Sequence, residues 1–135
     1  MTTTAALYGD MLTAPRQEKP WGHEVIFATG ENAYVGKLIT VRAGQALSLQ
    51  YHDAKDETIS ILSGEAQLEH GPNVDELRIR IMQPGHTVHL SPMVVHRITA
   101  VTDLQFVEVS TAATGWRDDV VRLSDRYGRT GTNTP

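Results

Sequence analysis

The sequence contains no cysteine, only 6% aromatic residues, and no apolar run that approaches the length of a membrane span. Without cysteine the chain can form neither a disulfide nor a thiolate metal site, which is typical of proteins from reducing compartments. A membrane-spanning helix needs about 20 consecutive apolar residues, so none is expected. The opening segment, "MTTTAALYGDMLTAPRQEKP", has no basic stretch followed by an apolar one, which argues against a signal peptide. Together these absences predict a cytoplasmic protein.

Basic residues are also too few for a protein that binds polyanions. The chain has 12 Lys and Arg against 16 Asp and Glu, which gives a formal net charge of -4. Nucleic acids and anionic membranes both require clustered Lys and Arg, so neither is an expected partner. The 135 residues are enough to bury one hydrophobic core but not two.

Short β-type segments recur between residues 22 and 110. They are rich in alternating or β-branched residues, and the breaks between them, such as "ATGEN", "SGE", "HGPN" and "QPGH", are rich in Gly, Pro and Asn. Such breaks are typical of hairpins. Short strands repeated at intervals of about ten residues predict an all-β sandwich or barrel.

The two ends of the chain differ from this central part. We expect residues 1–18 to form a flexible N-terminal arm, 19–129 a single domain, and 130–135 a disordered tail. Near the C-terminus, Asp118 is a candidate N-cap for one helical turn. An N-terminal arm can add an edge strand to a second copy of the chain, so a homodimer is expected.

The stretch "SLQYHDAKDE", residues 48–57, combines a strand end with several candidate ligands. Residues two apart in a strand share a face, so Gln50 and His52 point the same way. After the turn, Glu57 is in phase with the apolar positions of the next strand, and a carboxylate among apolar neighbours is costly unless it is paired or binds a metal. In "VVHRI", His96 is likewise in phase with apolar neighbours. Four potential ligands are therefore expected on inward faces of strands that can converge.

The spacing of these residues resembles the two motifs of the cupin superfamily. Gly44, Gln50, His52, Glu57 and Gly64 match the first motif, with Gln where many cupins have the first His; "QPGHTVHLSPMVVHR" matches the second. Together with "KPWG", "SGEA" and the ending "DDVVRLSDRYGR", they look like the type II mannose-6-phosphate isomerase cupins. These cupins occur as the C-terminal domain of bifunctional mannose-1-phosphate guanylyltransferases and as short stand-alone proteins. The resemblance extends from about Lys19 to Arg129.

The resemblance implies a small cupin barrel, a double-stranded β-helix or jelly roll, that binds one divalent metal ion through Gln50, His52, Glu57 and His96. Two imidazoles, a carboxylate and an amide oxygen suit Zn, Mn, Fe, Ni or Co, and without a thiolate little discriminates among these ions. Each residue also has an ordinary alternative. Gln50 can be a polar rim residue and His52 a turn histidine. Glu57 can pair with Lys55 or a neighbouring Arg, and His96 can be a hydrogen-bonded core histidine.

The activity implied is metal-dependent aldose–ketose isomerisation of a phosphorylated or nucleotide-linked sugar, of the mannose-6-phosphate isomerase type. Such a reaction needs a base, an electrophile for the carbonyl side, and cations for the phosphate. Lys37, Arg122 and Arg129 are the candidate catalytic residues, and Lys55 and Tyr127 are the candidate substrate-binding residues. The alternative for Lys37 is a solvated strand lysine, and that for Lys55 is a surface charge paired with Asp53 or Asp56. For the C-terminal residues, the alternative is a segment that closes the barrel base through an Asp–Arg pair.

Some positions depart from the pattern of the fused isomerases. Thr58 and Ile59 follow Glu57 where the fused enzymes have His-Trp, and Lys55 and Ala100 replace Arg and Asn. The fold and the metal site are thus expected to transfer better than the sugar substrate. Two other functions stay open: a non-catalytic sugar-binding cupin that serves an enzyme of glycan synthesis, and an iron-dependent oxygenase that uses the two imidazoles and the carboxylate as a facial triad.

Overall fold

The computed structural model describes residues 9, 11–31, 33–113 and 115–133 of the chain. In this part of the chain, eleven strands and one short 3₁₀ turn make up the regular structure. They are β1 (Arg16–Lys19), β2 (Gly22–Thr29), β3 (Tyr34–Val41), β4 (Leu49–Tyr51), β5 (Glu57–Ser63), β6 (Ala66–Gly71), β7 (Arg78–Met82), β8 (Thr87–Leu90), β9 (Val95–Ala100), β10 (Leu104–Thr111), η1 (Trp116–Asp118) and β11 (Val121–Ser124).

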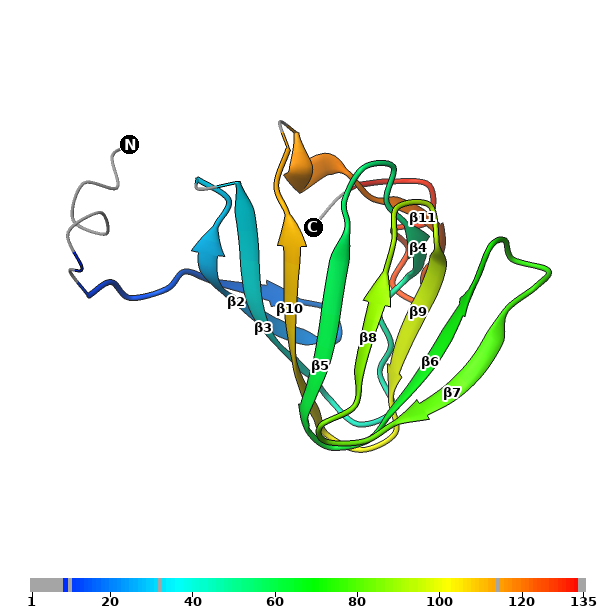
Figure 1. Cartoon of the computed structure of the whole chain (residues 1–135). Coiled ribbons are helices and arrows are strands. Elements are labelled where there is room, and N and C mark those ends of the chain that lie inside the picture. The colour runs from blue at the N-terminus through cyan, green and yellow to red at the C-terminus, as the bar shows by residue number, and fades with distance from the viewer. Residues whose placement is uncertain (1–8, 10, 32, 114, 134–135) are drawn as a thin grey trace.

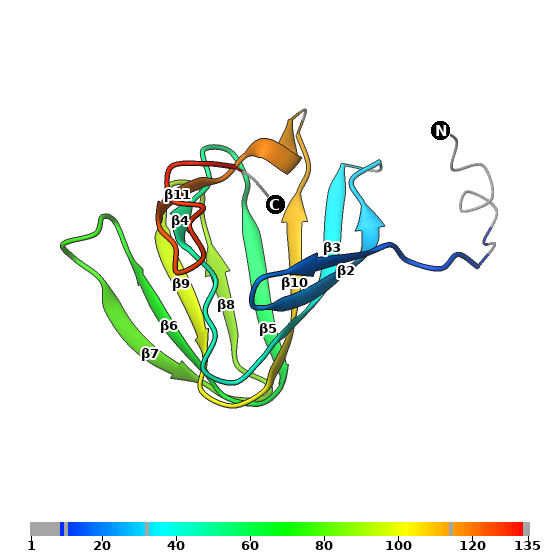
Figure 2. The same ribbon diagram turned by 180° about the vertical axis from the view of Figure 1, so that it is seen from behind.

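The strands form two antiparallel sheets that face each other (Figures 1 and 2). One has six strands in the order β1-β2-β3-β10-β5-β8, and the other has five in the order β11-β4-β9-β6-β7. The sheets converge at the bottom of Figure 1, and the segment that carries η1 and β11 lies at the opposite end. The all-β fold expected from the sequence is therefore confirmed.

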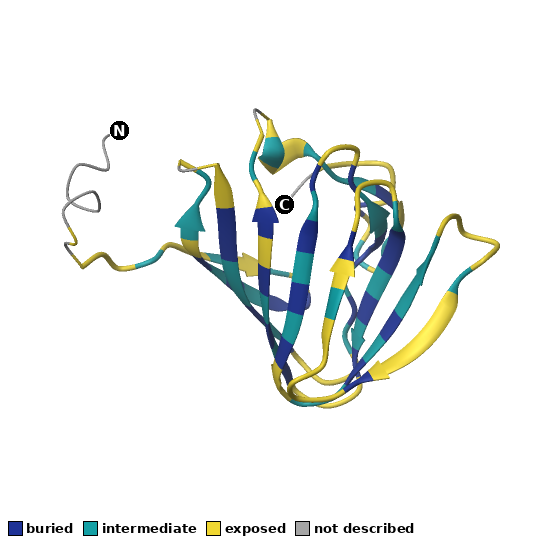
Figure 3. Ribbon diagram, in the orientation of Figure 1, coloured by how far each residue is buried: buried dark blue, intermediate teal, exposed yellow. Residues whose placement is uncertain are grey.

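The core lies between the sheets and follows the strand alternation. Inward positions are buried and the alternate positions are more exposed along β5, β9 and β10 (Figure 3). Each fully buried aliphatic or aromatic side chain contributes about 1.5–3 kcal/mol. The buried cluster consists of Trp21, Ile39, Val41, Ile59, Ile61, Ala66, Leu68, Met82, Leu90, Ile98, Ala100, Leu104 and Phe106. At the end of the sheets opposite their convergence, called the polar end below, the buried side chains include the polar residues His52 and Glu57.

Two details at the ends of the domain differ from the sequence-based expectation. Asp118 is the last residue of η1 and not its N-cap; that position is taken by Gly115, whose left-handed backbone (φ 80°) starts the turn without a side-chain hydrogen bond. Residues 16–18 of the expected N-terminal arm belong to β1, which pairs with β2 of the same chain.

The expected domain boundaries fall partly outside the described residues, which exclude 1–8, 10, 134 and 135. At the C-terminal boundary, the N–H of Gly131 donates to the carbonyl of Arg122, and that of Thr132 to the carbonyl of Arg129. The boundaries at 18 and 129 stay predictions. Among the residues that the structure describes, no helix has the length and apolarity needed to cross a membrane.

Candidate metal centre and ligand cavity

Three buried side chains from both sheets meet at the polar end of the barrel. His52 follows β4, Glu57 is the first residue of β5, and His96 lies in β9. One ligand atom from each lies within 4.8 Å of the others. The strand alternation had predicted the inward direction of Glu57 and His96, and their burial confirms it. This group could hold a metal ion.

The polar atoms of this cluster lie close together, but they do not satisfy one another's hydrogen-bonding capacity. Glu57 Oε1 lies 3.1 Å from His96 Nε2 and 3.4 Å from His52 Nε2. His52 Nε2 and both carboxylate oxygens of Glu57 are nevertheless buried without hydrogen-bond geometry to any partner among the described residues. Buried polar atoms left in this state are costly, and a coordinated cation would satisfy them. The residues present therefore fit a metal ion.

Backbone carbonyls fix the tautomers of the two histidines. His52 Nδ1 contacts the carbonyl oxygen of Asp119, and His96 Nδ1 lies 2.9 Å from that of Val94. A carbonyl oxygen only accepts, so Nδ1 must carry the hydrogen in each ring. In the neutral rings, the Nε2 lone pairs are thus left for the cluster, as is typical of histidines that bind metals.

The charges of the cluster depend on each other. Burial alone would raise the pKa of Glu57, but the His52 and His96 imidazoles lower this pKa well below its ordinary value. Burial opposes protonation of His96, but the neighbouring Glu57 carboxylate raises the pKa of His96 above its ordinary value. The carboxylate therefore stays ionised and attracts a positive charge, which either a proton or a metal ion can supply.

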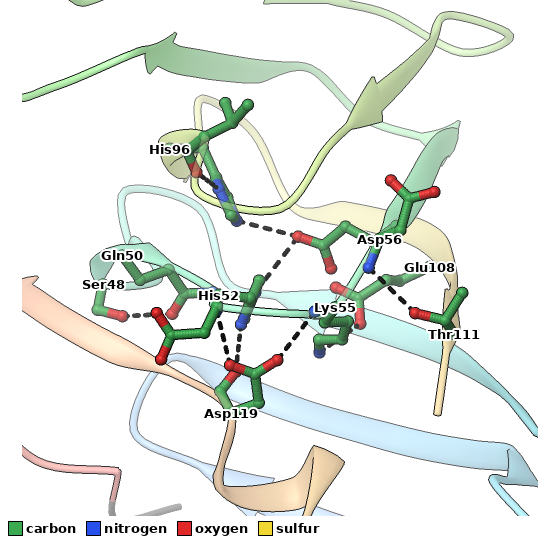
Figure 4. Close-up of polar contacts among 12 residues, drawn as sticks. Ser48, Gln50, His52, Lys55, Asp56, His96, Glu108, Thr111 and Asp119 are labelled. Atoms are coloured by element: carbon green, nitrogen blue, oxygen red, sulfur yellow. Dashed lines mark hydrogen bonds and ion pairs between the residues drawn. The ribbon is translucent and has the colours of Figure 1, made fainter. Parts of the chain in front are cut away.

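Gln50 adjoins this cluster. It stands directly opposite His96 across the pairing of β4 with β9. Its Oε1 accepts a 2.6 Å hydrogen bond from Ser48 Oγ (Figure 4). An amide oxygen with a second lone pair is a possible further ligand, and that role of Gln50 stays a prediction.

A cavity of about 330 Å³ lies beside the cluster, and Gln50 and His52 form part of its wall. Its lining is rich in charge although the chain is acidic overall. Six cationic side chains line it: Lys19, Lys37, Lys55, Arg117, Arg122 and Arg129. The carboxylates in the lining are Glu24, Glu108, Asp118 and Asp119. Such a volume suits a small molecule, and such a lining suits an anionic one.

Both candidate lysines line this cavity and are paired with carboxylates. Lys37 Nζ donates to Glu24 Oε1 at 3.2 Å. Lys55 is buried and lies 3.7 Å from Glu108. The alternative interpretation of Lys55 as a surface charge paired with a neighbouring aspartate is wrong, because β10 brings the distant Glu108 to it.

The two candidate arginines also line the cavity, with different partners. Arg129 forms a 2.9 Å ion pair with Asp125. Arg122 is buried, donates from Nη1 to the Thr132 carbonyl at 3.1 Å, and leaves Nε without a hydrogen-bond partner in the described chain. Burial and the nearby Arg129 lower the pKa of Arg122. A buried guanidinium with a free donor is well suited to bind an anion.

Tyr127 is the one candidate site residue outside this cavity and the metal cluster, and its role in substrate binding stays a prediction. It is absent from the cavity lining, and its ring packs against the hydrophobic core. Its hydroxyl donates to Gln45 Oε1 at 2.6 Å and lies 3.4 Å from the amide nitrogen of Ala46. The hydroxyl is thus used to fix the turn before β4.

Three carboxylates of the site, Glu24, Glu108 and Asp119, were not identified from the sequence. Glu108 lies in "LQFVEVST", in phase with Leu104 and Phe106, so the alternation that identified Glu57 applies to it equally. Burial and the neighbouring Glu57 raise the pKa of Glu108. Asp119 gave no comparable signal, because nothing in "WRDDVV" distinguishes it from Asp118.

Two facing antiparallel sheets with a buried His–Glu–His cluster at one end define a cupin domain. The chain belongs to the mannose-6-phosphate isomerase C-terminal family, whose model matches residues 11–125. The sequence-based recognition of this family is therefore confirmed.

Individual relatives agree with this assignment. The xanthan biosynthesis protein XanB of Xanthomonas campestris pv. campestris is 32% identical over 114 residues, which are 83% of this chain and 23% of XanB. The mannose-1-phosphate guanylyltransferase RfbM of Salmonella typhimurium is 26% identical over 112 residues, 82% of this chain and 22% of RfbM. The chain thus spans less than a quarter of the length of these relatives.

A solved structure shows the same fold at low sequence identity. The capsular polysaccharide assembling protein CapF of Staphylococcus aureus superimposes with a TM-score of 0.73 and 13% identity. The match covers 88% of this chain and 34% of CapF. At this identity the likeness concerns the fold alone.

Proposed function

We propose that this chain is a metal-dependent cupin that binds a phosphorylated sugar and catalyses its aldose–ketose isomerisation, as a mannose-6-phosphate isomerase does. One observation carries the proposal: the buried cluster of His52, Glu57 and His96 adjoins a cavity lined by cationic side chains. Membership of the mannose-6-phosphate isomerase C-terminal family supports the choice of reaction.

The metal would be held by His52, Glu57 and His96, with Gln50 as a further ligand. When bound, such an ion supplies an electrophile that stabilises the developing oxygen charge of an enediolate. Its identity among Zn, Mn, Fe, Ni and Co is left open by the donor set.

Arg122 is proposed to hold the phosphate. It is paired with Gln50 across β11 and β4, and Gln50 is opposite His96 across β4 and β9. Because neighbouring strands lie about 4.8 Å apart, the Arg122 backbone is about 10 Å from that of His96. A sugar phosphate can span this distance with its phosphate at the guanidinium and its carbonyl end at the metal centre.

The remaining polar side chains of the wall are proposed to orient the sugar and to move the proton. Lys37, held by Glu24, is placed to bind a hydroxyl group. The proton transferred between C1 and C2 needs a base in the cavity, and Glu24 and Glu108 are lining carboxylates outside the proposed ligand set.

Metal analysis and an activity assay test this proposal. Purified protein should contain about one divalent ion per chain, and a double variant, Glu57→Ala with His96→Ala, should lose it. His89→Ala is the matched control, because His89 is exposed and pairs with Asp56 outside the cluster. A coupled assay should detect fructose 6-phosphate formed from mannose 6-phosphate. Unchanged metal content in the double variant would reject the site, and metal-loaded protein without turnover would reject the isomerase.

A second candidate is a sugar-binding cupin without catalysis that serves an enzyme of glycan synthesis. Binding needs only the cavity and its cationic lining, without a base that moves the proton. Mannose 6-phosphate binding in a calorimeter without turnover would support this candidate, and iron-dependent oxygen uptake would instead indicate an oxygenase.

A further inference from the structure

Asp119, in the segment between η1 and β11, binds the turn that connects the candidate metal ligands His52 and Glu57. One carboxylate oxygen, Oδ1, accepts the backbone N–H of Asp53 at 2.7 Å. The other, Oδ2, accepts the N–H groups of Ala54 at 3.1 Å and Lys55 at 2.9 Å (Figure 4). These three residues belong to the short connection from His52 to Glu57.

The backbone of the same residue contacts the first of these ligands. The carbonyl oxygen of Asp119 accepts the hydrogen of His52 Nδ1. Since this contact fixes the tautomer and the orientation of the imidazole, it also aims Nε2 at Glu57. Asp119 therefore holds the turn with its side chain and the histidine with its main chain.

The position of Asp119 is itself fixed by the elements that precede and follow it in the chain, η1 and β11. The N–H of Asp119 donates to the Trp116 carbonyl of η1, and two residues later β11 begins its pairing with β4. Of the residues that it binds, Asp53 and Ala54 are exposed and Lys55 is buried. Water can therefore replace some of these bonds if the carboxylate is removed, so the domain can still fold with His52 less firmly placed.

We propose that Asp119 is a positioning residue of the metal centre, which sets the placement of His52 relative to Glu57 without binding the ion itself. The inference rests on the proposed function, because it presupposes that an ion is bound at this cluster. It assigns the C-terminal segment a role in metal affinity as well as in lining the cavity.

The neighbouring Asp118 offers a matched control. It has the same charge and lines the same cavity, but it is exposed, and the three N–H groups of the turn donate to Asp119 instead. Any effect of charge alone on the affinity for a cation should appear in both variants. An effect of positioning should appear only at Asp119.

The test measures metal affinity in chelator-treated wild-type protein and in Asp119→Ala, Asp119→Asn and Asp118→Ala. Zn²⁺ and Co²⁺ dissociation constants come from competition with a chromophoric chelator, and the visible spectrum of bound Co²⁺ reports the ligand geometry. Loss of an outer partner of a metal ligand typically weakens affinity about 10–100-fold. We expect a loss of this size in Asp119→Ala with an altered Co²⁺ spectrum, a smaller loss in Asp119→Asn, and wild-type behaviour in Asp118→Ala.

Two results would overturn the inference in distinguishable ways. Wild-type affinity and spectrum in Asp119→Ala, with only the melting temperature of the metal-free protein lowered, would make Asp119 a structural cap and leave the proposed function standing. Wild-type protein with no metal affinity would overturn both. If the alanine variant does not fold, Asp119→Asn, which keeps one acceptor oxygen, decides by the same two measurements.

Discussion

The ammonium group of Lys55 lies 3.7 Å from the carboxylate of Glu108, and both side chains are buried. Burial alone would lower the pKa of Lys55, but Glu108 and then Glu57 raise it above its ordinary value. The pair thus depends on both partners, one from the ligand turn and one from β10.

Replacing Lys55 by Met should destabilise the protein, because it leaves the Glu108 carboxylate buried without its cation. Loss of one partner from a buried ion pair costs about 3 kcal/mol, which urea denaturation at neutral pH would measure. The double variant, Lys55→Met with Glu108→Gln, should recover most of the loss. A double variant no more stable than the single one would contradict the pairing.

Asp125 should make stability sensitive to acid. Burial alone would raise the pKa of Asp125, but the Arg129 guanidinium and the backbone N–H groups of Arg129 and Tyr127 lower it. Because the folded-state pKa is below the unfolded one, this stabilisation is present above the ordinary carboxylate pKa and is lost as the pH falls toward the folded value.

The variant Asp125→Asn should accordingly be less stable at neutral pH, by about 2 kcal/mol for charge-assisted hydrogen bonds. Its difference from the wild type should shrink below about pH 4, where the aspartate becomes protonated. Urea denaturation across this pH range checks the prediction. A difference that does not vary with pH would mean that the charge of Asp125 is not the cause.

Arg122 should govern phosphate affinity without governing metal content. Arg122→Gln removes the buried guanidinium from the cavity wall and should weaken binding of mannose 6-phosphate about tenfold or more, since charged hydrogen bonds contribute about 1.5–3 kcal/mol each. Calorimetric titration measures this. Arg126→Gln is the control, because Arg126 is exposed, donates to the Gly44 carbonyl and is absent from the cavity lining. Equal affinity in both variants would remove Arg122 from the proposed phosphate site.

Two glycines of the first cupin motif should respond differently to alanine. Both have left-handed backbones, with φ 80° at Gly44 and 83° at Gly64. A Cβ atom at Gly64 would lie 2.0 Å from the carbonyl oxygen of Asp103, whereas one at Gly44 would meet nothing within 4 Å. Gly44→Ala should cost about 1–2 kcal/mol for the backbone conformation. Gly64→Ala should cost clearly more in thermal unfolding, and equal losses would contradict this packing.

Alternation along the strands predicted much of the site because burial there depends on local geometry. It placed Glu57 and His96 inside the barrel, and it would have placed Glu108 there had it been applied to β10. The motif spacing added the cupin fold and the family, which the comparisons confirm. The metal roles of Gln50, His52, Glu57 and His96 stay predictions.

Contacts between residues far apart in the sequence could not be predicted from strand alternation or motif spacing. The burial of Lys55 depends on the pairing of β5 with β10, which brings Glu108 to the ligand turn. The difference between Asp118 and Asp119 depends on where η1 ends. The position of Tyr127 depends on a hydrogen bond to Gln45, 82 positions away. None of these partners is specified by local sequence.

The candidate ligands belong to different sheets: Glu57 begins a strand of the six-stranded sheet, whereas His96 lies in the five-stranded sheet. An ion bound between them would therefore act as a cross-link between the two sheets at the polar end of the barrel, in a chain whose lack of cysteine rules out a disulfide. Unlike a disulfide, this metal cross-link would not be broken by thiols or other reductants. It would instead respond to chelators and to acid, so that the rigidity of the domain would follow the supply of metal and the pH of its surroundings.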